Sequence, residues 1–179
     1  MAGQQGTFAY RLMLLQYRLM DRLHLDPPET HLAGVAITPG MTVVDYGCGP
    51  GRFLPLLAER VGPSGKVYGV DIQPLGVQAA RERVTRAGLA NVEVVLADGY
   101  DSGVPTGCAN VVLLLDAFHA IEDRPALLAE IHRLLKPDGR LFMDPGHMPL
   151  EAAREAVRAS GRFRLVESDG SHMLWETVR

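Results

Sequence analysis

The sequence contains few cysteines, and they form no pattern of metal ligands. Cys48 and Cys108 are the two cysteines among 179 residues, and they lie far apart in the chain. Two isolated thiols are typical of proteins in a reducing cytoplasm. We therefore predict a cytoplasmic protein without a metal site. We interpret Cys48 as a small side chain beside a ligand rather than as a catalytic thiol.

The chain also lacks an excess of basic residues, a long apolar run and an internal repeat. Its 18 Lys and Arg against 21 Asp and Glu give a net charge of -3, and no basic cluster indicates a nucleic-acid partner. Residues 12–25 are apolar but are interrupted by Arg18, Asp21 and Arg22. We therefore expect neither a membrane span nor a signal peptide. The length and the apolar content of 47% predict one domain over residues 1–179.

Apolar segments of strand type and helix type alternate along most of the chain. We predict strands at 41–46, 66–71, 92–97, 110–115 and 140–144, and helices at 51–61, 74–87, 124–135 and 150–160. Pro137-Asp138-Gly139 is expected to form the turn before the strand at 140–144. Helices at 9–24 and 29–36 come first, so residues 1–38 are expected to form a helical segment before a core at 39–179.

The C-terminal residues break this alternation. Two strand-like runs, 163–167 and 172–178, are joined by Asp169-Gly170, which is typical of a β-hairpin. Strand–helix alternation predicts right-handed βαβ units, and the hairpin adds antiparallel strands. We therefore predict an α/β fold: a doubly wound, three-layer, Rossmann-like sandwich with a mostly parallel seven-stranded sheet.

The segment Val43 to Phe53, VVDYGCGPGRF, is the most informative for function. A predicted strand containing Asp45 leads into Gly47, Gly49 and Gly51, and a predicted helix follows. Glycine permits positive φ and a close approach of ligand to backbone, and free N–H groups at a helix start attract anionic groups. The segment predicts a site for a nucleoside-type cofactor.

Aspartates follow the other predicted strands in the same way. Asp71, Asp98, Asp116 and Asp144 lie at or just after the carboxyl ends of their strands, as does Asp45. In doubly wound sheets, ligands bind outside these ends, near the point where strand order reverses. An acidic residue at position 71, twenty residues after Gly51, suits ribose hydroxyls and disfavours a 2′-phosphate.

These features resemble the class I S-adenosylmethionine-dependent methyltransferases. Asp45 followed by G-x-G-x-G resembles the first motif of that family, and Leu134-Leu135-Lys136-Pro137-Asp138-Gly139 resembles its entry into the fifth strand. The resemblance covers residues 40–145 well. The spacing departs from the dinucleotide fingerprint G-x-G-x-x-G, because Arg52 stands where the third glycine is required.

The resemblance implies a role for each cofactor-site residue. The methionine end of S-adenosylmethionine would be held by Asp45, Gly47, Cys48, Gly49 and Gly51. The ribose would be held by Asp71, and the adenine by Ile72, Asp98 and Gly99. The sulfonium end would be lined by Asp116 and Ala117. The cofactor would leave the reaction as S-adenosylhomocysteine.

The resemblance also implies in-line methyl transfer to a small-molecule acceptor whose identity the sequence leaves open. His119 and His147 are candidate general bases, with Asp116 as an orienting partner. Tyr10 and Tyr17 are candidate substrate contacts from an N-terminal segment that covers the site. The loop Asp101 to Gly107 is another candidate contact. Because the chain is compact, a homodimer in which a second subunit helps to bind the acceptor is one expected assembly.

Two other functions remain open at this point. A non-catalytic module that binds S-adenosylmethionine in support of a partner would need the same loop and aspartates. A nicotinamide-dependent oxidoreductase is the weaker alternative. Arg52 departs from its fingerprint, and the sequence has no Tyr-x-x-x-Lys pair.

Overall fold

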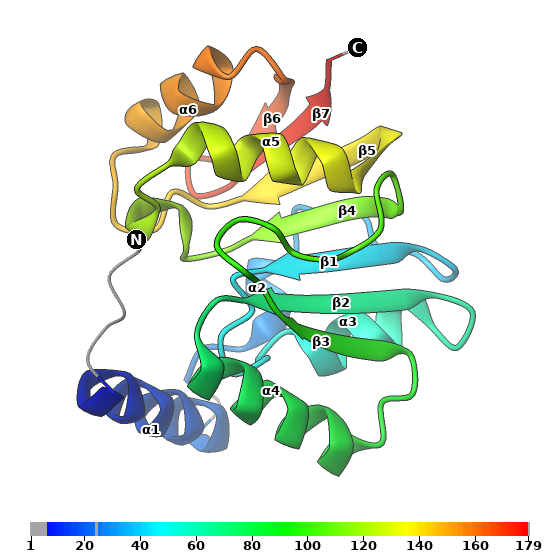
Figure 1. Ribbon diagram of the computed structural model, residues 1–179, viewed down its shortest axis with the longest axis vertical. Coiled ribbons are helices and arrows are strands. Elements are labelled where there is room, and N and C mark those ends of the chain that lie inside the picture. Colours follow the sequence, from blue (N-terminus) through cyan, green and yellow to red (C-terminus); the bar gives the residue numbers. More distant parts are fainter. Residues whose placement is uncertain (1–6, 24, 179) are drawn as a thin grey trace.

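The computed structural model describes residues 7–23 and 25–178 (Figure 1). Its seven strands form one sheet in the order β3-β2-β1-β4-β5-β7-β6. They are β1 (Thr42–Tyr46), β2 (Lys66–Asp71), β3 (Val92–Leu96), β4 (Ala109–Leu114), β5 (Leu135–Met143), β6 (Phe163–Ser168) and β7 (Met173–Thr177). The first five pair in parallel, and β7 runs antiparallel to both neighbours. The predicted fold class is confirmed.

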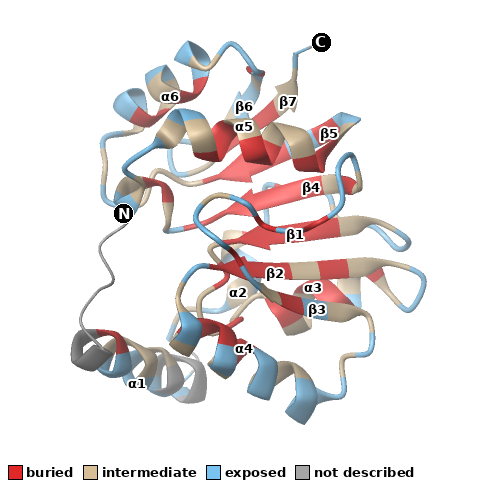
Figure 2. Ribbon diagram, in the orientation of Figure 1, coloured by how far each residue is buried: buried red, intermediate tan, exposed pale blue. Residues whose placement is uncertain are grey.

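Helices cover both faces of the sheet. One apolar cluster joins the strands to α3 (Leu54–Val61) and α4 (Pro74–Ala87), and a second joins them to α5 (Arg124–Leu134) and α6 (Leu150–Ala159). Neighbouring residues of β1 belong to different clusters, Val43 to the first and Val44 to the second. Figure 2 shows the resulting buried central strands. Burial on both faces explains why these strands are continuous apolar runs in the sequence.

Local signals set several element boundaries where the sequence predicts them. α4 begins at Pro74 and ends before Gly88, which adopts the left-handed conformation with φ 63°. The first turn of α5 is capped by Asp123, whose side chain accepts a 3.0 Å hydrogen bond from the Ala126 N–H. Proline lacks the N–H that a first turn leaves unpaired, and glycine tolerates positive φ after the last turn.

The structure corrects three predicted boundaries. The helix predicted from residue 51 begins at Leu54, because Gly51 has φ 73° and so cannot be part of a right-handed helix. The short helix predicted at 29–36 is limited to α2 (Pro28–His31). The Pro137-Asp138-Gly139 turn predicted before the fifth strand lies within β5, where the pairing shifts between Ala109 and Val111 of β4. This segment is therefore an irregularity inside a longer strand.

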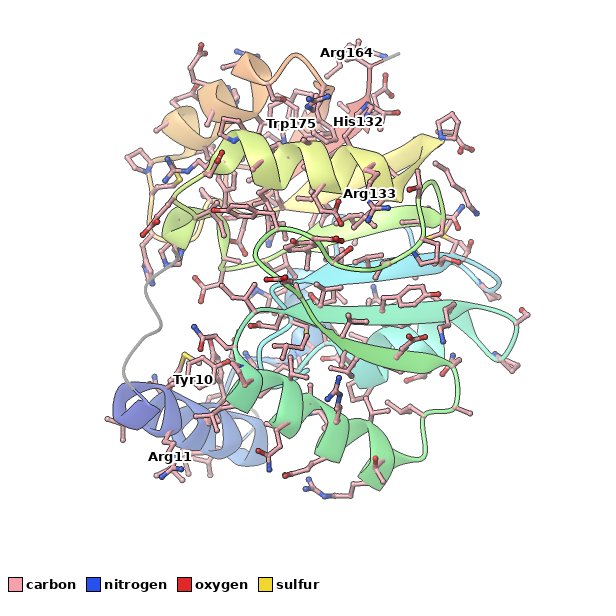
Figure 3. The ribbon with its side chains drawn as sticks, in the orientation of Figure 1. Tyr10, Arg11, His132, Arg133, Arg164 and Trp175 are labelled. Atoms are coloured by element: carbon pink, nitrogen blue, oxygen red, sulfur yellow. The ribbon has the colours of Figure 1, made fainter. Side chains whose placement is uncertain are left out.

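The N-terminal helix α1 (Thr7–Leu23) packs beside α4. Residue 24, the last residue of the helix predicted there, lies outside the described part. Tyr10 is 5% exposed and faces α4, whereas Arg11 points away (Figure 3). The leucines of the other face are more than half exposed: Leu12, Leu15, Leu19 and Leu23. Among the described residues, every helix is too short or too polar to cross a bilayer.

Candidate active site

The strand order reverses between β1 and β4, and this reversal locates the candidate site. β1 is followed along one direction of the sheet by β2 and along the other by β4. A crevice forms at such a reversal, because the two connections leave the sheet on opposite faces. Asp45 lies near the end of β1, Asp71 ends β2, and Asp116 follows β4 by two residues. The predicted placement of these aspartates at one edge is confirmed.

The glycine loop after β1 folds back across β2. The N–H groups of Gly47 and Cys48 both donate to the Val70 carbonyl, at 2.7 and 3.0 Å. Gly51 has φ 73°, and a Cβ on it would lie 3.1 Å from the Ala80 Cβ and 2.7 Å from Leu54 Cδ1, so a larger residue would be strained there. Among the described residues, no atom lies within 4 Å of a Cβ placed on Gly49, and this residue has φ 51°. The loop therefore has open space at Gly49, on the side where a ligand can approach the backbone.

Asp71 connects this loop to the start of α4. Its Oδ2 accepts a 2.7 Å hydrogen bond from the Gly49 N–H, and its Oδ1 accepts one of 2.7 Å from the Gln73 N–H. Burial raises the pKa of this carboxyl, and the hydrogen bonds oppose that rise. Each carboxylate oxygen has a second acceptor position, so Asp71 can hold the loop and also accept from a ligand hydroxyl. The sequence did not predict its role in holding the loop.

Asp45 is a buried carboxyl without a full set of partners. It is 2% exposed, and its Oδ2 has no hydrogen-bond partner within the described part of the chain. Burial, together with the nearby charge of Asp71, raises the pKa of Asp45 to about 7. A buried polar atom without a partner costs free energy, and a bound polar or cationic group would remove that cost. This oxygen and the open space at Gly49 together fit a ligand such as S-adenosylmethionine.

Cys48 is buried in the same loop. A Cβ on Gly69 would lie 3.2 Å from its sulfur, so the side chain packs against β2. Burial and the charges of Asp45 and Asp71 raise the pKa of its thiol. A thiol held in its neutral form is a poor nucleophile, which agrees with the interpretation of Cys48 as a small packing residue.

The residues predicted to contact adenine lie at the open side of the site. Ile72 is 37% exposed and directly follows Asp71. Asp98 and Asp101 form a tight turn in which each N–H donates to the other residue's carbonyl at 3.0 Å. Gly99, with φ 60°, lies within this turn. The Asp98 side chain is therefore presented to solvent beside the end of β3.

The loop that follows β4 lies against the glycine loop. A Cβ on Gly47 would lie 3.0 Å from the Cβ of Ala117, so these two backbones approach closely. Asp116 has φ 49°, an uncommon conformation for a non-glycine residue. Asp144, just after β5, accepts hydrogen bonds from the N–H groups of Asp116 at 3.0 Å and Gly146 at 2.7 Å. One carboxylate therefore joins the loops that follow β4 and β5.

Both candidate histidines lie in these two loops. His119 belongs to the 3₁₀ turn η1 (Phe118–Ala120), and His147 follows β5. Their ring centroids are 4.8 Å apart, and His119 Nδ1 lies 3.8 Å from Asp116 Oδ1. The structure therefore brings together Asp116, His119 and His147; the sequence indicated Asp116 as a partner of these histidines but did not place the two histidines side by side.

Tyr10 and Tyr17 reach the same edge from α1. A Cβ on Gly76 would lie 2.3 Å from Tyr10 Oη and 3.3 Å from the Gly49 carbonyl, so Tyr10 lies where α4 meets the glycine loop. Burial and the charge of Asp71 raise the pKa of Tyr10. Burial raises the pKa of Tyr17, and the charge of Asp116 adds to the rise.

The sequence did not predict an ion-pair network of Arg52, Asp26 and His31 next to Tyr17. The Arg52 guanidinium lies 5.4 Å from the centre of the Tyr17 ring and donates to Asp26 Oδ2 at 3.1 Å. Asp26 also contacts His31 Nε2 at 2.7 Å. The arginine in place of the fingerprint's third glycine was the available signal. It connects the glycine loop to the segment between α1 and α2.

The loop Asp101 to Gly107 is fixed against α5. The Ser102 N–H donates to Glu130 Oε1 at 3.1 Å, and Arg133 Nη2 donates to the Val104 carbonyl at 2.9 Å. Arg133 and Glu130 also pair with each other at 2.7 Å. Figure 3 shows Arg133 between α5 and this loop. These contacts attach the middle of the loop to the body of the protein.

Comparisons with known proteins agree with this geometry. A methyltransferase domain family matches residues 37–167. Nocamycin O-methyltransferase from Saccharothrix syringae is 41% identical over 117 residues, which are 65% of this chain and 41% of the relative. Demethylmenaquinone methyltransferase from Listeria monocytogenes is 29% identical over 120 residues, which are 67% of this chain and 51% of the relative. The chain thus spans about half or less of these relatives' lengths.

A solved structure agrees over a larger share of both chains. The S-adenosylmethionine-dependent methyltransferase from Aquifex aeolicus is 30% identical, with a TM-score of 0.74 over 88% of this chain and 93% of that one. The sheet, the glycine loop and the aspartates at the strand ends described above agree with an enzyme family that uses S-adenosylmethionine and releases S-adenosylhomocysteine. The chain belongs to the class I S-adenosylmethionine-dependent methyltransferase family.

Proposed function

We propose that this chain transfers the methyl group of S-adenosylmethionine to a small-molecule acceptor at the carboxyl ends of β1 and β4. The proposal is carried by the buried Oδ2 of Asp45, which has no hydrogen-bond partner among the described residues, together with the open space at Gly49 of the same loop region. A buried carboxylate oxygen without a partner suits a ligand with a cationic group, such as the amino group at the methionine end of this cofactor.

Each cofactor contact is proposed for a specific residue. The loop Gly47, Cys48, Gly49 and Gly51, with Asp45, would hold the methionine end. Asp71 would accept from the ribose hydroxyls, while Ile72, Asp98 and Gly99 would contact the adenine. Asp116 and Ala117 would line the sulfonium end. The positions of these residues along the carboxyl edge of β1 to β4 support this assignment.

When bound, S-adenosylmethionine supplies a methyl group already activated on sulfur, so the protein mainly aligns the acceptor and excludes water. An acceptor that must lose a proton needs a base, for which we propose His119 or His147. Their position next to Asp116, at the proposed sulfonium end, supports this role.

We propose that residues 1–38 cover this site and that residues 39–179 form the core of a single domain. Tyr10 is buried at the glycine loop, and the Tyr17 ring contacts Arg52 of that loop, which supports the covering role. Residues 1–6 and 24 of this segment lie outside the described part of the chain. We also propose a cytoplasmic location, which the two free cysteines support.

A homodimer is proposed from the exposed face of α1. Leu12, Leu15, Leu19 and Leu23 follow one another at spacings of three or four residues, as in helices that pack on other helices. All four are more than half exposed. Light scattering of the purified chain tests the proposal, and Leu15→Glu with Leu19→Glu should convert a dimer to a monomer.

Two measurements test the proposed function. Calorimetric titrations with S-adenosylmethionine, S-adenosylhomocysteine and NADH should show binding of the first two ligands only. Binding of NADH alone would favour the oxidoreductase instead. Incubation with methyl-labelled cofactor and a panel of phenols, quinols and amines should then give labelled product. Tight cofactor binding without transfer to any acceptor would favour a non-catalytic binding module.

A further inference from the structure

Three side chains with metal-ligand chemistry meet at the loops that follow β4 and β5. Asp116, His119 and His147 each offer one ligand atom, and these atoms all lie within 4.8 Å of one another. We propose that they bind a divalent transition-metal cation such as Zn²⁺. Two imidazole nitrogens and one carboxylate oxygen are ligands that zinc and similar cations prefer. The sequence alone predicted no metal site, because Asp116 and His119 are close in the sequence but His147 lies in a different loop.

The spacing of the ligand atoms is close to that of a zinc site. With Zn–N and Zn–O bonds of about 2.0–2.2 Å, neighbouring ligands of a tetrahedral ion lie about 3.3 Å apart. His119 Nδ1 and Asp116 Oδ1 are 3.8 Å apart, and the widest separation in the set is 4.8 Å. His147 is exposed and lies in a loop, so a rotation of its side chain can close the remaining distance.

The surroundings of His119 Nδ1 support its role as a metal ligand. His119 Nδ1 is buried, yet it has no hydrogen-bond partner within the described part of the chain. At 3.8 Å from Asp116 Oδ1 it is too far for a hydrogen bond. A buried nitrogen without a partner costs free energy that coordination of a cation would recover. A simple histidine–aspartate ion pair would be expected to close this gap instead.

The surrounding backbone holds the three ligands in place. The Asp144 carboxylate accepts hydrogen bonds from the N–H groups of Asp116 and Gly146, and so joins the two ligand-bearing loops. A Cβ on Gly146 would lie 2.1 Å from His119 Nδ1, so only glycine leaves room for this imidazole. Carboxylates that orient ligand segments in this way are common around metal ions.

Three protein ligands leave at least one coordination position open. Metal sites with an open position bind water or substrate oxygen and lower the pKa of the bound group. With both imidazoles on the cation, the metal ion would take the place of the histidine base proposed above, and an acceptor hydroxyl bound to it would lose its proton to solvent more readily. This use of the site rests on the proposed function, but binding of the cation itself does not.

The test uses the untagged protein, stripped with a chelator and titrated with ZnCl₂ in a calorimeter. We expect one Zn²⁺ per chain and a loss of affinity of more than about tenfold in Asp116→Asn, His119→Ala and His147→Ala. His132→Ala, on α5, is the matched control and should bind within about twofold of the parent protein. A Co²⁺ titration should give ligand-field absorption bands that His147→Ala abolishes.

The titrations distinguish a cation site from a cluster of side chains that binds no metal. Because His147 is exposed, its variant should fold, and an unchanged far-UV circular dichroism spectrum checks this. Failure of Zn²⁺ to bind the parent protein would overturn the proposal. Equal binding by the parent protein and all three variants would also overturn it. Since the titration contains no S-adenosylmethionine, a negative result leaves the proposed methyl transfer standing.

Discussion

Replacing the carboxylate of Asp71 by an amide should separate its two roles. Asp71→Asn keeps the size of the side chain and one carbonyl oxygen, but it removes the negative charge. In the parent protein both carboxylate oxygens accept backbone hydrogen bonds of 2.7 Å, from Gly49 and Gln73. The variant can satisfy only one of these donors with oxygen, and its NH₂ group opposes the other.

The expected loss of affinity follows from the proposed contact with the ribose. A hydrogen bond to a charged group contributes about 1.5–3 kcal/mol, so the dissociation constant for S-adenosylmethionine should rise by about 10- to 150-fold. The unpaired backbone donor should lower the free energy of unfolding by about 1–3 kcal/mol. Calorimetric titration measures the first quantity and urea denaturation the second.

Asp138→Asn is the matched control, because Asp138 is exposed in β5 and lies outside the carboxyl edge of the sheet. It should change neither the dissociation constant for S-adenosylmethionine nor the free energy of unfolding. If Asp71→Asn binds S-adenosylmethionine as tightly as the parent protein, the ribose assignment is wrong. If the variant loses stability without losing affinity, Asp71 serves only to hold the loop.

Three further predictions concern the same edge of the sheet. Gly51→Ala should lower the free energy of unfolding by about 1–3 kcal/mol more than the control Gly103→Ala, as measured by urea denaturation. Both glycines have positive φ, but among the described residues only Gly51 has close neighbours. The pKa of Asp45 is about 7 in the folded protein and about 3.9 in the unfolded chain. Between these values the folded state binds more protons than the unfolded state, so the contribution of Asp45 to the free energy of unfolding falls as pH rises from about 4 to about 7. Asp45→Asn should remove up to about 4 kcal/mol of that fall, and equal pH dependence of unfolding in both proteins would contradict the pKa. Arg133→Gln should leave the buried Glu130 without its cation, and faster proteolysis within residues 101–107 than in the parent protein is the expected result.

The fold was predictable because its signals are local. Alternating apolar segments, Pro74 before α4 and Gly88 after it are all readable within short windows of sequence. The extended β5 was not predictable in this way. Its irregular start depends on pairing with β4, and Pro137-Asp138-Gly139 has the composition of an ordinary turn.

The parts of the candidate site that lie within one segment were predictable, whereas contacts between different loops were not. The glycine loop and the aspartates at strand ends follow from the strand pattern. The grouping of Asp116, His119 and His147 depends on β4 and β5 being neighbours and on the Asp144 hydrogen bonds between their loops. Nor does the sequence show that Arg52 would connect the glycine loop to Asp26. Such contacts depend on the three-dimensional approach of segments that are distant in the chain.

A crystal structure of the chain with S-adenosylhomocysteine tests the central claim most directly. We predict ribose hydroxyls on Asp71, the amino-acid end at Asp45 and Gly49, and the sulfur facing Asp116. A structure from crystals soaked with saturating ligand in which Tyr10 fills the space beside Gly49 and Asp71, with no nucleoside present, would contradict it.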